Sequence, residues 1–110
     1  MTFDFENNKL RKQFADAGSL QKAFGKLAAG ITERIDDITA SPTLAVLRQI
    51  GKANCHKLSG KRKDQWAVII SGNYRLIFEL DHNPIPMKSA TEIDFASVTR
   101  IRIVEVIDYH

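Results

Sequence analysis

Apolar residues in the first half of the chain recur at helical spacing. Asn7 or Asn8 can cap a short helix that ends at Gly18. Ser19 opens a second helix, which carries the longest apolar stripe of the sequence. The stripe consists of Leu20, Phe24, Leu27, Ala28, Ile31, Ile35 and Ile38. Its spacing predicts one continuous amphipathic helix of about five turns.

Two glycines interrupt this stripe, and a third helical segment follows it. Gly25 and Gly30 weaken a helix, and they leave room for another element to approach closely. Ser41 and Pro42 have the residue types of an N-cap and a first helical position. Leu44, Leu47 and Ile50 then share one face before Gly51. We therefore expect a third, short helix in this region.

The second half of the chain changes to the patterns of β-strands. Residues 65–71 (Q-W-A-V-I-I-S) are rich in β-branched and apolar residues, as in a central strand that is covered on both sides. Gly72-Asn73 is a two-residue connection that favours a tight hairpin. In the strand that follows, residues 74–80 alternate, so that one face is buried and Arg75 projects from the other.

A further strand is expected near the end of the chain, after a long irregular segment. Residues 81–97 contain two prolines and no clear periodicity, which predicts a long excursion at the edge of the domain. Residues 99–107 then alternate, with Thr99, Ile101, Ile103, Glu105 and Ile107 on one face. A short strand over residues 2–5 can join the sheet edge. These elements predict an α+β fold in which N-terminal helices pack on a small antiparallel sheet.

Composition places the chain among ordinary folded proteins. At 110 residues, with 44% hydrophobic and 26% charged residues, it has the size of one domain and is neither disordered nor low-complexity. A single cysteine, Cys55, excludes an intramolecular disulfide. The acidic first residues and the short apolar runs resemble neither a secretory signal nor a membrane span. We expect a single domain over residues 1–110 in a cytoplasmic protein.

The charge is distributed unevenly along the chain. Residues 48–75 carry seven lysine and arginine side chains against one aspartate, a net charge of +6. Residues 76–99 carry a net charge of −3. A strongly basic segment with an aromatic ring suits a polyanion such as RNA, because cations replace the counterions of the phosphates. The alternative interpretation is a solvated loop whose charges keep the protein soluble.

The sequence lacks several well-known signatures of catalysis. It has no glycine-rich phosphate loop and no strand-to-helix nucleophile elbow. Cys55-His56, His82 and His110 do not have the spacing of a zinc site. We therefore expect neither a metal nor another cofactor.

Three features could still carry chemistry. The segment H-K-L-S-G-K-R-K-D-Q-W at residues 56–66 places the imidazole of His56 before a basic cluster. Arg75 follows a tight turn at the start of a strand. Asp108, Tyr109 and His110 offer a carboxylate, a phenol and an imidazole at the C-terminus. Each feature taken singly also has a structural explanation: a loop histidine, an arginine paired with Glu79 or Glu105, and fraying terminal residues.

Together these features resemble the HigB-like branch of the RelE/ParE superfamily of toxins. The resemblance rests on the order H-x-L-x-G-x(5)-W-x(4)-S-G-N-Y-R-L-I-F-E, followed by a last strand that ends V-I-D-Y-H. It covers residues 53–80 and 100–110 by motif, and the helical first half by architecture. It implies a RelE-like fold and a toxin of a type II toxin–antitoxin system.

The resemblance also implies an activity and its residues. Most such toxins are ribosome-dependent mRNA endonucleases (mRNA interferases), which cleave without metal by attack of a 2′-hydroxyl on the adjacent phosphorus. Such a reaction needs a base, an acid and a cation for the developing charge. The catalytic residues implied here are His56, Arg75, Asp108, Tyr109 and His110. Arg75 would clamp the phosphate, and either His56 or Asp108 would be the base.

Binding residues and partners follow from the same resemblance. The implied RNA-binding residues are Lys57, Lys61, Arg62, Lys63 and Trp66. The implied partners are mRNA, the ribosome and a cognate antitoxin with a DNA-binding helix-turn-helix, and neither a membrane nor a metal. The sequence departs from the family at one point: relatives usually place a basic residue on the strand after the aromatic residue, whereas Trp66 is followed by Ala67, Val68, Ile69 and Ile70.

Two alternative functions remain at this stage. The ParE branch of the same fold contains non-enzymatic poisons of topoisomerases, which need no acid–base set. The missing strand charge motivates the other alternative, an inactive relative that binds RNA or a protein partner. Fold alone does not decide among these functions.

Overall fold

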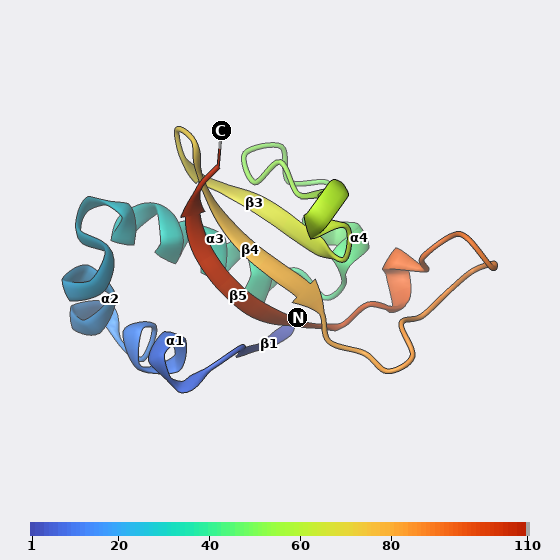
Figure 1. Ribbon diagram of the computed structural model, residues 1–110, viewed down its shortest axis with the longest axis horizontal. Coiled ribbons are helices and arrows are strands. Elements are labelled where there is room, and N and C mark those ends of the chain that lie inside the picture. Colours follow the sequence, from blue (N-terminus) through green and yellow to red (C-terminus); the bar gives the residue numbers. More distant parts are fainter. Residues whose placement is uncertain (110) are drawn as a thin grey trace.

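The computed structural model describes residues 1–109 and has a five-stranded sheet in the order β1-β5-β4-β3-β2 (Figure 1). Strand β1 pairs with β5 in parallel, and the other neighbours are antiparallel. The strands are β1 (Thr2–Phe5), β2 (His56–Lys57), β3 (Gln65–Ser71), β4 (Tyr74–Leu80) and β5 (Arg100–Asp108). The predicted α+β fold is confirmed, with the N-terminal strand at the sheet edge. The sheet is mixed because of that strand.

The helices precede the hairpin of the sheet. They are α1 (Asn8–Gln13), α2 (Ala17–Phe24), α3 (Ala28–Ala40) and α4 (Leu44–Leu47). Short 3-10 turns occur at η1 (Gly25–Leu27), η2 (Gly60–Arg62) and η3 (Phe95–Ser97). Asn7 caps α1, as one of the two expected candidates, and its side chain accepts a hydrogen bond from the Leu10 N–H at 2.9 Å. In the part of the chain that the structure describes, no helix is long and apolar enough to cross a membrane.

The prediction of one long helix from Ser19 is wrong, because the helix is interrupted at Gly25. This glycine ends α2 with φ of 57° and ψ of −127°, a conformation that L-residues rarely adopt. The apolar stripe therefore continues on two helices, α2 and α3, joined by η1. Asp16, rather than Ser19, caps α2 by accepting a hydrogen bond from the Ser19 N–H at 2.7 Å. The residue before the short α4 is Thr43, not Ser41.

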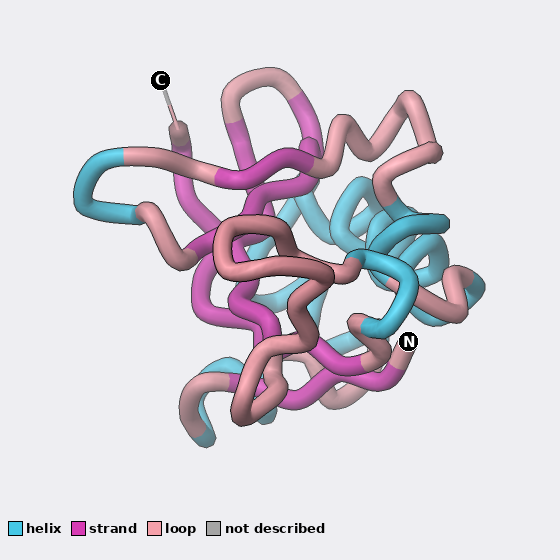
Figure 2. The backbone as a smooth tube through the Cα atoms, turned by 90° about the vertical axis from the view of Figure 1, so that its right-hand side faces the viewer, coloured by secondary structure: helices cyan, strands magenta, loops and turns pink. Residues whose placement is uncertain are grey.

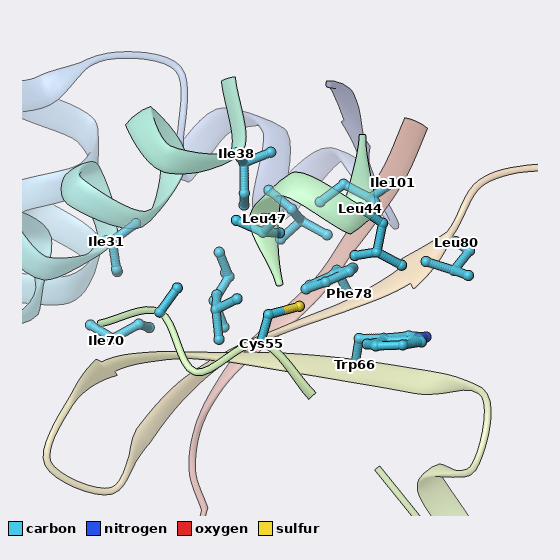
Figure 3. Packing of buried hydrophobic residues seen from close by; sticks show 14 of the residues in the cluster. Ile31, Ile38, Leu44, Leu47, Cys55, Trp66, Ile70, Phe78, Leu80 and Ile101 are labelled. Carbon is cyan, nitrogen blue, oxygen red and sulfur yellow. The ribbon is translucent and has the colours of Figure 1, made fainter. Parts of the chain in front are cut away.

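One layer of hydrophobic side chains lies between the sheet and the helices α3 and α4, which Figure 1 shows behind the sheet. Ile31 and Ile38 of α3 are fully buried, as are Leu44 and Leu47. They face the sheet residues Phe78 and Ile101, and Figure 3 shows the Cys55 side chain within the same cluster. The helical stripe predicted the buried side of α3 correctly.

Contact between α3 and β3 is unusually close at Gly30. A Cβ atom at this position would lie 2.8 Å from the carbonyl oxygen of Ile70 and 2.9 Å from its Cγ2. Nearby, the buried Arg34 donates a hydrogen bond from Nε to the Ile69 carbonyl at 2.6 Å and from Nη1 to Asp37 at 2.5 Å. The prediction that a glycine in this stripe allows close approach is confirmed at Gly30.

Strict alternation along the last strand is wrong beyond Ile103. Ile77 of β4 pairs with Glu105, and the next residue, Phe78, pairs with Ile103. The register therefore shifts between them, and Val104 is left in a β-bulge. After the bulge, Val106 joins the core on the helix side, whereas Ile107 contacts the smaller cluster on the other side. The bulge therefore moves Glu105 and Ile107 to the face opposite Ile101 and Ile103.

We call the side of the sheet away from α3 the open face. Its small apolar cluster consists of Leu58, Ala67 and Ile77, with Val104 and Ile107 packed against it. In Figure 1 the segment that contains η2 crosses in front of this face. An ion-pair network borders the cluster: Arg62 pairs with Glu105, and Arg102 pairs with Glu6, Glu79 and Asp81. The open face thus has an apolar centre with a charged border.

The long excursion at residues 81–97 has internal structure. Met87 and Ile93 form an isolated antiparallel bridge. The Lys88 N–H donates to the Glu92 carbonyl at 2.8 Å, and the Asp94 N–H donates to the Pro86 carbonyl at 2.9 Å. Figure 2, which views the molecule from that side, shows the excursion as a loop in front of the strands. The prediction of a long segment outside the sheet is confirmed.

Candidate active site

His56 lies on the short edge strand β2, where it pairs with Ala67 of β3. Directly paired residues of antiparallel strands share a face, so the His56 side chain lies on the open face. Its Nδ1 is 2.7 Å from the carbonyl oxygen of Asn54. Because a carbonyl can only accept, Nδ1 carries the hydrogen. The lone pair of a neutral imidazole is then on Nε2, where it can take up a proton.

Arg75 lies two strands from His56 on the same face. Register aligns Arg75 with Ile69 of β3 and with Ile107 of β5, two residues along the sheet from the row that contains His56 and Ile77. Two strand spacings of about 10 Å and this offset of about 7 Å therefore separate the two positions. The guanidinium donates to the carbonyls of Gly72 at 2.6 Å and Tyr74 at 3.1 Å, which hold it at the hairpin. Among residues 1–109, no carboxylate forms an ion pair with it. Its charge is therefore available to an anion.

The pairing of Arg75 with Glu79 or Glu105, which was the structural alternative, does not occur. Glu105 pairs with Arg62 at 2.7 Å, and Glu79 pairs with Arg102. Both carboxylates are thus already in contact with other guanidinium groups. An arginine that has no carboxylate partner within the described chain is what a phosphate clamp requires.

Asp108, near the C-terminus, lies on the other face of the sheet from His56 and Arg75. Asp108 pairs with Tyr74, whose side chain points to the opposite face from that of Arg75 by the alternation of the strand. Asp108 accordingly lines a cavity that also includes Tyr74, Phe24 and Lys26. The strand register therefore does not bring Asp108 onto the open face with His56.

Tyr109 continues the pairing of the last strand. Its N–H donates to the Asn73 carbonyl at 2.9 Å, and its side chain is 39% exposed. This contact anchors the chain beside the β3–β4 hairpin, and Figure 1 shows the end of β5 next to this hairpin. His110 lies outside the described residues.

The basic segment borders the open face, but its members differ in what they contact. Lys57, Lys61 and Lys63 are exposed, and none of them forms an ion pair among residues 1–109. Arg62 is half-buried and donates to Gln65 Oε1 and Glu105 Oε1, both at 2.7 Å. Three lysines are thus free to contact phosphates, whereas Arg62 holds its segment against the sheet.

Trp66 does not have the exposed ring that stacking on RNA bases requires. Its side chain is 2% exposed and belongs to the main core. The ring meets Phe95 edge-on, with 5.7 Å between the ring centroids and 83° between the ring planes. Its prediction as an RNA-stacking residue is corrected, because residue 66 pairs with Phe78 on the helix side of β3. The residue type suggested stacking on RNA, but it does not show on which face of the strand the ring lies.

The cysteine beside His56 faces the interior. Burial raises the pKa of the Cys55 thiol to about 12, although the nearby Arg48 acts in the opposite direction. Within residues 1–109, no group of three or more histidine, cysteine, aspartate or glutamate side chains is arranged to hold a metal ion.

Arg48 takes a position that no sequence motif indicates. Its guanidinium carbon lies 4.1 Å from the centroid of the Phe95 ring and 5.9 Å from that of Trp66. These distances are typical of cation–π contacts. The net charge of the segment pointed to a basic surface, but no local pattern links Arg48 to an aromatic ring 47 positions later.

The arrangement of the sheet, hairpin and helices defines the fold class, and a solved structure shares it. The chain is similar to a solved structure of a YoeB/ParE toxin from Agrobacterium tumefaciens, with a TM-score of 0.57, 13% identity and full coverage of both chains. At this identity the likeness concerns the fold alone. A comparison with curated proteins finds no match.

The family follows from the sequence. Residues 3–88 match the family described as the RelE-like toxin of type II toxin-antitoxin system HigB. The chain therefore belongs to the HigB-like toxins of the RelE/ParE superfamily, and membership implies a cognate antitoxin as its partner. The matched region contains His56 and Arg75, whereas Asp108 and Tyr109 lie beyond it.

Proposed function

We propose that this toxin is a ribosome-dependent mRNA endonuclease that cleaves by attack of a 2′-hydroxyl on the adjacent phosphorus. The observation that carries the proposal is the placement of His56 and Arg75 on one open face, with Arg75 free of carboxylate partners among the described residues. Exposed Lys57, Lys61 and Lys63 at the same border supply charge for the RNA backbone. The proposed location is the cytoplasm.

The proposed roles follow from the geometry of each group. His56 Nε2 takes the proton of the 2′-hydroxyl, while Nδ1 stays bonded to the Asn54 carbonyl. The 2′-oxygen then bonds to phosphorus, and the bond to the 5′-oxygen of the next nucleotide breaks. Arg75 stabilises the charge that develops on the phosphate oxygens. The products are a 2′,3′-cyclic phosphate and a 5′-hydroxyl end.

The leaving 5′-oxygen needs a proton, and the C-terminal residues are the proposed source. Tyr109 lies at the hairpin beside Arg75, held by its contact with the Asn73 carbonyl. Asp108 projects from the opposite face at the same strand end. We therefore assign the base to His56 and propose the Tyr109 hydroxyl as the acid. Asp108, which projects from the other face, and His110, outside the described residues, are further proposed site residues without an assigned step.

The test is to map RNA ends that carry a 5′-hydroxyl minutes after the toxin is induced in cells without antitoxin. We expect new ends within translated messages, and we expect His56→Ala and Arg75→Ala each to reduce them at least about a hundredfold. Lys12→Ala, an exposed change on α1, is the control that keeps the ends at wild-type level.

The two alternative functions give different results in the same experiment. Growth arrest without new ends, unaffected by His56→Ala, would overturn the nuclease and favour a topoisomerase poison. Normal growth without new ends would favour an inactive binding relative. The missing basic residue of β3 keeps this second outcome relevant, because one phosphate contact of the family pattern is absent.

A further inference from the structure

A cavity of about 540 Å³ lies between the edge strand β2 and the excursion at residues 81–97. His56 and Lys57 line it from β2, and Met87 and Lys88 line it from the excursion. His56 therefore borders both this cavity and the open face that carries Arg75. A cavity of this size accommodates a small ligand or one nucleotide.

The wall on the side of the excursion is built before any ligand binds. Backbone bonds between Lys88 and Glu92 and between Asp94 and Pro86 close its turn, and the Met87–Ile93 bridge joins its two arms. Met87 is 47% exposed despite its apolar side chain. A preformed wall with an exposed thioether offers a flat ring a contact surface at little cost in conformational entropy.

Three further residues of the lining, Arg48, Trp66 and Phe95, contact one another. The buried Trp66 supports Phe95 edge-on, and Phe95 lies 4.1 Å from the guanidinium carbon of Arg48. Arg48 itself is exposed. An arginine held against an aromatic ring on one side can stack on a nucleobase with its other side. Trp66 thus contributes to this surface indirectly, by positioning Phe95.

The charges of the lining favour an anion. Arg48, Lys57 and Lys88 contribute three positive charges against the one negative charge of Glu92. None of these three cations forms an ion pair within residues 1–109. Cations combined with stacking surfaces are the pattern of single-stranded nucleic-acid sites. An acidic peptide would use the cations but not the stacking surfaces.

We propose that this cavity is a nucleotide subsite, which holds the unpaired base next to the scissile phosphate and selects which nucleotide flanks the cut. The inference rests on the proposed nuclease function, because His56 connects the cavity to the proposed reaction centre. Arg48 and Met87 contact the base, and Lys57 and Lys88 neutralise the flanking phosphates. The excursion thereby becomes a determinant of cleavage specificity.

The first test measures binding and does not depend on cleavage. A 2′-O-methyl oligoribonucleotide, which lacks the attacking hydroxyl, is titrated against the purified chain and its variants. We expect Arg48→Ala to weaken binding about tenfold, and Arg48→Lys to weaken it by most of that factor, because lysine keeps the charge without the planar group. Lys52→Ala, a nearby lysine outside the cavity lining, is the control, and circular dichroism checks that each variant is folded.

The second test compares the nucleotides that flank the mapped 5′-hydroxyl ends. We expect Met87→Ala and Lys88→Ala to change the base frequencies at one position beside the cut, and Lys52→Ala to leave them unchanged. Unchanged oligonucleotide affinity for the Arg48 variants, together with unchanged flanking frequencies, would overturn the subsite.

The two proposals fail in different ways. If the wild-type protein generates no ends but Arg48 variants still lose oligonucleotide affinity, the nuclease fails and nucleotide binding in the cavity stands. If ends form normally and only binding of an antitoxin depends on Arg48 and Lys88, the cavity is a protein-docking site and the subsite is wrong.

Discussion

Arg62 and Glu105 form an ion pair at 2.7 Å between two segments that are 43 residues apart in sequence. This contact, together with that to Gln65, ties the basic segment to the open face. We expect Arg62→Ala to lower the free energy of unfolding by about 1 kcal/mol, because both partners are partly exposed. Urea denaturation followed by circular dichroism measures this change.

Lys61→Ala is the matched comparison for Arg62, since it removes one charge from the same 3-10 turn. We expect Lys61→Ala to change stability by less than about 0.5 kcal/mol. In a plot of the logarithm of RNA affinity against the logarithm of salt concentration, Lys61→Ala should reduce the magnitude of the slope by about 0.7. Equal losses of stability in the two variants would contradict the structural role of Arg62.

Ile69 marks the place on the open face where a further positive charge would fit. Of the four residues after Trp66, Ala67 is fully buried, Val68 and Ile70 belong to the core, and Ile69 pairs with Arg75. We expect Ile69→Lys to raise RNA affinity. The slope of log affinity against log salt concentration should become steeper by about 0.7. The lysine stem can keep the half-buried contacts while its amine reaches solvent.

The control for this change is Ile69→Gln, which is polar and long but uncharged. Binding of the 2′-O-methyl oligonucleotide at several salt concentrations compares the two variants. A steeper slope for both, or for neither, would mean that the charge at residue 69 does not contact the phosphates.

Gly30 is the point where α3 touches β3. In Gly30→Ala the new methyl group would meet the backbone oxygen of Ile70 at 2.8 Å, so the helix must shift. We expect a loss of about 1–3 kcal/mol in the free energy of unfolding, as for other overpacked positions. Gly51→Ala is the matched control, because its Cβ would meet no atom within 4 Å. A Gly30 variant as stable as the wild type would disprove the close contact.

Because Cys55 is buried, we expect the free energy of unfolding to depend on pH in the alkaline range. The pKa of Cys55 rises from 9.0 to about 12 on folding, so the unfolded state releases its proton first as pH increases. The contribution of this thiol to stability is complete below pH 9 and declines between pH 9 and pH 12. Denaturation curves of the wild type and Cys55→Ala across this range should converge as pH rises, whereas parallel curves would contradict the shifted pKa.

Thiol labelling gives a second measurement of the same property. Native Cys55 should react with a disulfide reagent at pH 8 far more slowly than in the unfolded chain, because the thiolate is the reactive form. Rapid labelling of the native protein would contradict burial of this side chain.

Local sequence patterns were sufficient to predict most of the elements. The alternation of residues 74–80, the Gly72-Asn73 turn and the apolar stripe of α3 each depend on neighbours within a few residues. The motif around His56 and Arg75 likewise identified the family, which the match over residues 3–88 confirms. Such short-range features can be read directly, because the periods of helices and strands are properties of the local backbone.

Other features depend on contacts between distant segments. Gly25 ends α2 with a positive φ and so divides the predicted helix, and the bulge at Val104 reverses the faces of Glu105 and Ile107. Strand register places Trp66 in the core and separates Asp108 from His56. The stack of Arg48 on Phe95 joins residues 47 positions apart. A residue type states which chemistry is possible, and only the packing of the whole chain determines which side chains share a face, because a one-residue shift in pairing exchanges the two faces of a strand.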